Sequence, residues 1–197
     1  MSINRYSFFL YLYVMQILIT EKQVEKLLEQ LMGKSPSKPD KKYSFLTPFS
    51  EVGNSVLSAI SMIKKHEGFC DGKKNCPPHT IGYGTRTDLH PELKGKKIDD
   101  AIATAYVKKD LEENIIPAIK RMVKVPLKEH QIAALISLIY NIGPGNFRKS
   151  QLLKDLNNNN MEGVKKNWEE FTSAEGKQLS GLISRRWDEI RLFFGGK

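Results

Sequence analysis

The sequence has few cysteines and no recognisable set of metal ligands. Two cysteines among 197 residues are too few for the disulfide-dense scaffold of a small secreted protein. Cys70 and Cys76 are close enough in sequence to form one disulfide in an oxidising compartment, although closeness alone does not require it. His66 and His79 lie nearby, but the four residues lack the usual spacing of zinc ligands. We therefore expect no metal site and no cofactor.

An apolar run long enough to span a membrane is also missing. The longest uncharged apolar stretch, residues 7–20, has fourteen residues and follows Arg5, whereas a spanning helix needs about 20. The stretch fits the hydrophobic part of an export signal or anchor, although no small-x-small cleavage site follows it. The stretch is equally consistent with a segment that is buried against a partner in an assembly. We therefore predict that residues 7–20 contact either a membrane or a partner in an assembly.

Acidic residues are in the minority. The chain has 31 Lys and Arg against 22 Asp and Glu, a formal net charge of +9, which indicates an anionic partner. Charge alone does not choose between nucleic acid and a bacterial cell wall rich in carboxylates and phosphates. The basic residues are dispersed, however, and no aromatic-interleaved basic tract or known nucleic-acid motif is present. We therefore expect no nucleic-acid partner.

Glu67 ends a predicted helix on its core-facing side. Ile63, Ile60 and Val56 lie four, seven and eleven residues before it, which places all four on one helical face. Gly68 follows as a helix terminator. Burial and the negative end of the helix dipole both disfavour a charged carboxylate. Glu67 is therefore a candidate general acid.

The run T-I-G-Y-G begins at Thr80, and its two glycines are typical of a sharp bend or a close backbone approach. Together with E-G-F at Glu67, this run resembles the active-site signature of the phage-type lysozymes, glycoside hydrolase family 24. In the family pattern, eight residues separate the Glu from an Asp or Cys, and five more precede a Thr. Cys76 matches the middle position, but only three residues then separate it from Thr80. Asp71, the only carboxylate inside the loop, is the chemical alternative.

The resemblance covers residues 54–194. The stretch ALISLIYNIGPGNFRKSQLL resembles the central helix and following turn of the family, and the stretch from Gly181 resembles its last, arginine-rich helix. From the first of these we expect four substrate-binding residues, namely Tyr140, Asn141, Phe147 and Ser150. Alternatives are open for several residues: Phe147 can belong to the core, Ser150 can cap a helix, and Arg185 and Arg186 can be surface or carbonyl-pairing residues.

The pattern of elements is α+β, with one small β excursion around residues 69–87 and helices elsewhere. Asn54 or Ser55 is expected to cap the first helix of the domain, and Ile102 to lie on the apolar face of the next. Periodicity predicts helices at 54–67, 98–123, 127–142, 151–156, 161–171 and 182–194. The resemblance implies a lysozyme-like fold, a hairpin lobe and a helical lobe with a cleft between them. We predict an arm at 1–20, an amphipathic helix and linker at 21–50, and a catalytic domain at 51–197.

The resemblance also implies the reaction, hydrolysis of the β-1,4 bond between N-acetylmuramic acid and N-acetylglucosamine in peptidoglycan. Glu67 would protonate the leaving oxygen, Thr80 would orient the water, and Cys76 or Asp71 would be the second catalytic group. If Cys76 is bonded to Cys70, its thiolate is lost, so that Asp71 must serve or activity is low.

Two alternatives to this muramidase remain open. One is a weakly active or non-catalytic wall-binding or virion module that keeps a lysozyme shell. The other is a lytic transglycosylase, for which Glu67 alone would suffice. The expected setting is a phage-encoded protein acting at the host cell wall, either from the host cytoplasm and then the periplasm, or from the virion.

Overall fold

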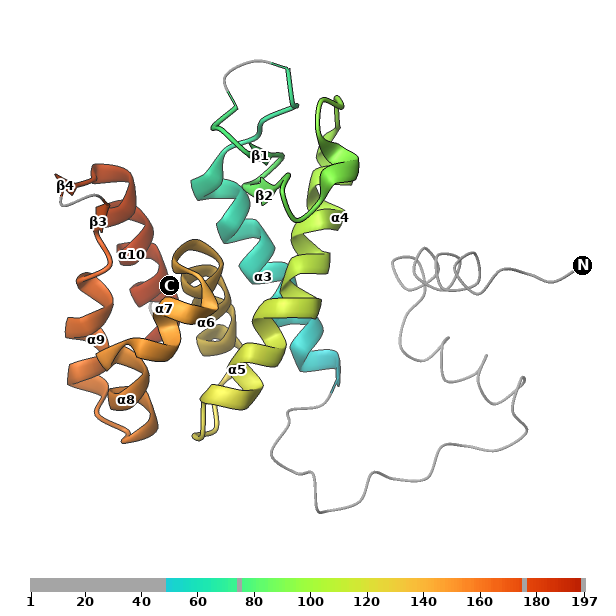
Figure 1. The fold of residues 1–197 in the computed structure, drawn as a ribbon. Helices are drawn as coiled ribbons and strands as arrows, with labels where there is room; N and C mark the ends of the chain where they lie inside the picture. Colours follow the sequence, from blue (N-terminus) through green and yellow to red (C-terminus); the bar gives the residue numbers. More distant parts are fainter. Residues whose placement is uncertain (1–48, 74–75, 175–176, 196–197) are drawn as a thin grey trace, which may run out of the picture. The chain divides into compact units, whose positions relative to one another are not determined.

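The computed structural model describes residues 49–73, 76–174 and 177–195 (Figure 1). The chain divides into two units, Met1–Leu46 and Thr47–Lys197, and all described residues belong to the second. The predicted arm at 1–20 and nearly all of segment 21–50 lie outside the described residues, so the predicted domain boundaries stay predictions. None of the described helices has the length and apolarity needed to cross a membrane.

Helix α3 (Phe49–Glu67) carries the predicted core-facing stripe and ends at the predicted residue. Its apolar positions are buried at Val56, Ile60 and Ile63. The helix begins at Phe49, before the predicted cap, and the hydroxyl of Ser55 within it donates to the backbone oxygen of Glu129 at 3.1 Å. Gly68 follows with φ +70°, a left-handed conformation that suits glycine and stops the helix.

The predicted β excursion is a two-stranded antiparallel hairpin. Strands β1 (Thr80–Ile81) and β2 (Thr85–Arg86) pair in the register Thr80↔Arg86 and Ile81↔Thr85. Cys70 adds an isolated bridge to Gly82. The short 3-10 helix η2 (Pro91–Leu93) follows. In Figure 1 the hairpin lies beside the end of α3 that carries Glu67.

Helix α4 (Asp100–Asp110) continues through a π-helical turn, η3 (Leu111–Ile115), into α5 (Ile116–Met122). Asp99 caps α4 by accepting from the Ile102 backbone N–H at 2.8 Å. The predicted apolar face is wrong at Ile102, which is 41% exposed. Residues four apart face the core instead, because they follow one another on the same side of the helix: Ala103, Val107, Leu111 and Ile115.

Helix α6 (Glu129–Ile142) is the centre of the domain, and all seven of residues 133–139 are buried in it. It packs against both α3 and α10 (Ser180–Phe193). Three helices lie between α6 and α10 in the chain: α7 (Pro144–Lys149), α8 (Gln151–Asn157) and α9 (Met161–Glu169).

Two elements of this half were not predicted. The first is α7, because Gly143–Gly145 was interpreted only as a stop, whereas Pro144 occupies the first helical position, where proline is tolerated. The second is a small hairpin, β3 (Ser173–Ala174) with β4 (Lys177–Gln178). The predicted α+β class, with the β structure confined to small hairpins, is confirmed.

Candidate active site

The carboxyl of Glu67 is held by an arginine from the last helix. Glu67 is the final residue of α3, and its Oε1 accepts a hydrogen bond from Arg185 of α10 at 2.5 Å. The Glu67 side chain is 23% exposed and the Arg185 side chain 3%. The Glu67 side chain is therefore partly accessible to solvent, while its cationic partner is buried.

The turn of the β1–β2 hairpin approaches the other oxygen of this carboxyl. Gly84 has φ +89°, and a Cβ placed on it would lie 3.3 Å from Glu67 Oε2. A side chain would therefore both strain the backbone and press on the carboxyl. Here the glycine permits the close backbone approach that the sequence pattern predicts.

Tyr140 of α6 joins the hairpin turn to the helical part of the domain. Its hydroxyl donates to the backbone oxygen of Tyr83 at 2.8 Å. Burial and the negative charge of Glu67 both raise the pKa of Tyr140. The hydroxyl therefore stays protonated and remains a hydrogen-bond donor at physiological pH. Helices α3, α6 and α10 and the hairpin turn thus meet at Glu67.

Arg185 belongs to a buried network of charges on α10. Glu189 is 0% exposed, and its Oε1 accepts from Arg185 Nε at 3.1 Å and from Ser137 Oγ at 2.7 Å. Its Oε2 accepts from Trp168 Nε1 at 3.1 Å and lies 2.9 Å from Arg186 Nε. Burial lowers the pKa of Arg186 to about 10, so it stays charged at neutral pH.

Two carboxylates, Glu67 and Glu189, therefore face two guanidinium groups, those of Arg185 and Arg186. When both carboxyl groups are ionised, the network is formally neutral, which offsets much of the cost of burying its charges. Because each member is buried or half-buried, removing one would leave its partners without compensation. The network fixes α10 against α6 and holds Arg185 in place behind Glu67.

The predicted second catalytic group lies in the loop before β1, and its two candidates have structural partners there. Cys76 forms a disulfide with Cys70, with Cα atoms 5.5 Å apart, so it carries neither thiol nor thiolate in this form. Asp71 Oδ1 accepts from the Lys73 backbone N–H at 3.0 Å. Its Oδ2 lies 3.9 Å from Lys97 Nζ. Of the two side chains, only Asp71 still has an acidic group.

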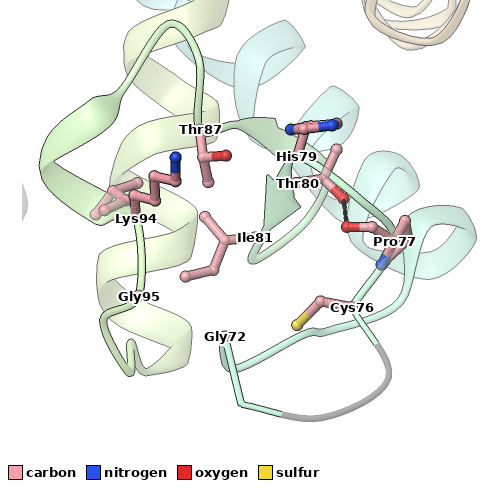
Figure 2. Close-up of a pocket in the computed structure, with 10 residues that line it drawn as sticks. Gly72, Cys76, Pro77, His79, Thr80, Ile81, Thr87, Lys94 and Gly95 are labelled. Carbon is pink, nitrogen blue, oxygen red and sulfur yellow. Dashed lines mark hydrogen bonds between the residues drawn. The ribbon is translucent and has the colours of Figure 1, made fainter.

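Thr80, the predicted water-orienting residue, donates its hydroxyl to the backbone oxygen of Pro77 at 3.1 Å. Thr80 and Cys76 lie on the wall of a hollow (Figure 2). Its volume is about 250 Å³. Glu67 is not one of the described residues that line this hollow. The structure therefore places Thr80 and Cys76 together on the wall of one hollow.

The four predicted substrate-binding residues have different environments. Tyr140 lies beside the Glu67 site, and Asn141 is exposed, with its Oδ1 accepting from Arg186 at 3.1 Å. Phe147 is 0% exposed, so it is a core residue and has no surface to offer a sugar. Ser150 caps α8 by accepting from the Leu153 backbone N–H at 3.1 Å. Tyr140 and Asn141 are retained as candidates, whereas Phe147 and Ser150 have structural roles.

Arg185 was missed as a site residue because a pair of arginines on an amphipathic helix usually faces solvent. One signal was available in the sequence. Arg186 lies four residues before Ile190 and seven before Phe193, which places it on the apolar face of the helix. Glu189 follows Arg185 by four residues, the spacing of a helical ion pair. Within the described residues, no group of three His, Cys, Asp or Glu side chains could hold a metal ion.

A helix that ends in a half-buried glutamate, a short hairpin against that glutamate, and a helical layer that supplies its arginine define a lysozyme-like enzyme. Residues 64–189 match the family described as phage lysozyme, and the chain belongs to this family. The predicted family, fold and class of enzyme, a glycosidase of the muramidase type, are confirmed.

Named relatives agree with this assignment. The chain is 37% identical over 153 residues to the SAR-endolysin of Enterobacteria phage P21, covering 74% of this chain and 92% of that protein. It is 30% identical over 149 residues to the endolysin of Bacillus phage B103, covering 73% of this chain. The match spans only 55% of that endolysin's length.

Solved structures show the same fold. The muramidase domain of SpmX from Asticaccaulis excentricus superposes with a TM-score of 0.62 at 30% identity, over 69% of this chain and 94% of that domain. A mutant of P22 lysozyme superposes with a TM-score of 0.56 at 31% identity, over 69% of this chain and 94% of that one. The site around Glu67 lies within the residues that match the family.

Proposed function

We propose that this chain is a phage endolysin that hydrolyses the β-1,4 bond between N-acetylmuramic acid and N-acetylglucosamine in the host cell wall. The observation that carries the proposal is the placement of Glu67, one carboxyl oxygen of which is paired with Arg185 and the other of which faces the hairpin turn. The net charge of +9 supports binding to an anionic polymer.

In the proposed mechanism, Glu67 Oε2 carries the proton, because Oε1 already accepts from Arg185. The proton passes to the glycosidic oxygen as the bond to C1 of N-acetylmuramic acid breaks. Water adds to C1 and loses its proton to the second catalytic group. The products are a new reducing end and a free 4-hydroxyl. Arg185 stabilises the carboxylate that Glu67 becomes when its proton leaves.

We assign the second role to Asp71, with Thr80 as the residue that orients the water. Asp71 is a carboxylate, its side chain is 34% exposed, and the disulfide removes the thiolate of its competitor Cys76. The Thr80 hydroxyl donates to Pro77 and can still accept a hydrogen bond from a water molecule.

We further propose that residues 7–20 bring the enzyme to a membrane, so that it acts on the wall from the periplasm. The uncharged apolar composition of this stretch after Arg5 supports membrane contact. Attachment to a virion is the alternative. Fractionation of cells that express the full chain, compared with a chain in which Leu12 and Val14 are changed to Asp, tests this point.

The reaction is tested by digesting purified peptidoglycan with the wild-type chain and with Glu67→Gln. Wild type is expected to release muropeptides with new reducing ends, and the variant to release none. Anhydro-sugar ends would identify a lytic transglycosylase instead. Binding to peptidoglycan without any cleavage would identify a wall-binding module, the alternative that the comparisons do not favour.

A further inference from the structure

Tyr83 lies in the turn between β1 and β2 and is held by two charged residues from different helices. Its hydroxyl donates to Asp100 Oδ1 at the start of α4. Lys64 Nζ of α3 lies 2.6 Å from the same oxygen and 4.9 Å from the centre of the Tyr83 ring. We call Tyr83, Asp100 and Lys64 the turn anchor. The proposed mechanism uses none of the three.

The backbone of Tyr83 is fixed as firmly as its side chain. Its carbonyl oxygen accepts from the Tyr140 hydroxyl of α6 at 2.8 Å. The preceding residue, Gly82, exchanges two backbone hydrogen bonds with Cys70, at 2.9 and 2.8 Å. The following residue, Gly84, lies so near the Glu67 carboxyl that an added Cβ would be 3.3 Å from Oε2. The three residues of the turn are therefore held from three directions, immediately beside the general acid.

The chemistry of the turn anchor suits a positional role more than a stabilising one. The Asp100 side chain is 61% exposed, and exposed ion pairs add little to folding stability. Tyr83, by contrast, is only 7% exposed. Burial raises the pKa of Tyr83, and the hydrogen bond from Lys64 lowers the pKa of Asp100. The donor therefore stays protonated and the acceptor stays charged over the working pH range.

We propose that Tyr83 is a positioning residue for the Glu67 carboxyl. Held by Asp100 and Lys64, it fixes the turn so that Gly84 bounds Oε2, the oxygen that carries the proton to the glycosidic oxygen. Small displacements of a catalytic group slow the chemical step strongly while leaving substrate binding almost unchanged. The inference rests on the proposed role of Glu67 as the general acid.

The test compares kcat and KM on uncrosslinked peptidoglycan strands for wild type, Tyr83→Phe, Asp100→Ala and the double variant. Tyr83→Phe keeps the ring and removes only the hydroxyl, so we expect kcat to fall about tenfold with KM within about twofold. Since both changes remove the same hydrogen bond, the double variant is expected to lose no more than the larger single loss.

Tyr106→Phe is the matched control. The Tyr106 hydroxyl also donates to a carboxylate, Glu92 Oε1, at 3.0 Å, and its ring also packs against a neighbour, His90, at 5.0 Å between centres. These contacts join α4 to η2 instead of to the turn. We expect this control to keep wild-type kcat. An equal loss of kcat in Tyr106→Phe, or no loss in Tyr83→Phe, would overturn the inference.

A second measurement separates this inference from the proposed function. Amide hydrogen exchange at Gly82 and Gly84 is expected to speed up in Tyr83→Phe and to stay unchanged in Tyr106→Phe, whether or not the chain hydrolyses peptidoglycan. Unchanged exchange in Tyr83→Phe would contradict the positioning role of Tyr83 and would leave the proposed function unaffected. The proposed function would be contradicted instead if the wild-type chain did not cleave peptidoglycan. It would also be contradicted if Glu67→Gln cleaved as fast as wild type.

Discussion

His66 and Asp188 join the end of α3 to α10 directly beside the ion pair of the site. His66 Nε2 lies 2.9 Å from Asp188 Oδ2, and Lys65 Nζ lies 2.7 Å from the same oxygen. The next residue of α3 is Glu67, whose partner Arg185 lies one helical turn before Asp188. Three consecutive residues of α3 therefore contact α10, so the position of the carboxyl depends on how these two helices pack.

The pH dependence of stability is expected to report on His66. Burial and the positive charge of Arg185 lower the pKa of His66 from its ordinary value of 6.5, and Asp188 only partly opposes this. The neutral imidazole is therefore the form that the fold prefers. The contribution of His66 to the free energy of unfolding is complete above pH 6.5. It is lost as the pH falls below that value toward the depressed pKa, because the unfolded chain then binds more protons than the folded one.

Melting temperatures between pH 8 and pH 5 check this prediction. Below about pH 6.5, the melting temperature of His66→Asn is expected to fall less steeply with decreasing pH than that of wild type. A His66→Asn curve parallel to that of wild type would contradict the assignment.

Glu67→Gln is expected to lower the rate of peptidoglycan hydrolysis by at least about a hundredfold, because a positioned general acid contributes at least that much. The amide keeps the size of the side chain and still accepts from Arg185. The fold should therefore survive, as circular dichroism and a single cooperative melt would show. A variant that clears cell walls at the normal rate would remove Glu67 from the mechanism.

Arg185→Met is expected to destabilise the domain by about 3–5 kcal/mol, because it leaves Glu67 and Glu189 without their shared buried cation. Arg185→Lys keeps the charge, but a single ammonium lacks the forked geometry that reaches both carboxylates, so an intermediate loss is expected. Urea unfolding measures both. The exposed Arg148 of α7 serves as control, and Arg148→Met should stay within about 0.5 kcal/mol of wild type.

Gly84→Ala tests the contact between the hairpin turn and the carboxyl. A positive φ costs an alanine about 1–2 kcal/mol, and the new methyl would also lie 3.3 Å from Glu67 Oε2. Gly95 is the matched control because it has φ +73° and an added methyl group there would meet no atom within 4 Å. Both variants should lose similar stability, but only Gly84→Ala should lose activity. Equal activities would mean that the turn does not bound the carboxyl.

The second catalytic group is identified by comparing Cys70→Ser, Cys76→Ser and Asp71→Asn. Either serine variant removes the same disulfide and is expected to cost about 2 kcal/mol of stability, the entropic value for so short a loop. If Cys76 has only a structural role, the two serine variants should have equal activity. Asp71→Asn should raise the barrier by more than about 2 kcal/mol, a factor of about thirty in rate. A more active Cys70→Ser variant would instead assign the role to the Cys76 thiolate.

The local features of the site could be predicted from the sequence. The stripe that ends at Glu67 and the glycine hairpin at residues 80–86 depend on neighbouring residues, so periodicity and turn chemistry were enough to predict them. The Glu67–Arg185 pair could not be predicted in this way, because its members are 118 residues apart. The orientation of the first turn of α4 could not be predicted either. There the cap at Asp99 and the packing of the core decide which side Ile102 faces.

The separation between Glu67 and Arg185 has a consequence during synthesis. A ribosome delivers the acid more than a hundred codons before it delivers the guanidinium group that holds it, since the two residues are 118 positions apart. A nascent or prematurely terminated chain that stops short of α10 can form the hairpin and still lacks a completed centre. We therefore expect partial products that lack α10 to have no lytic activity.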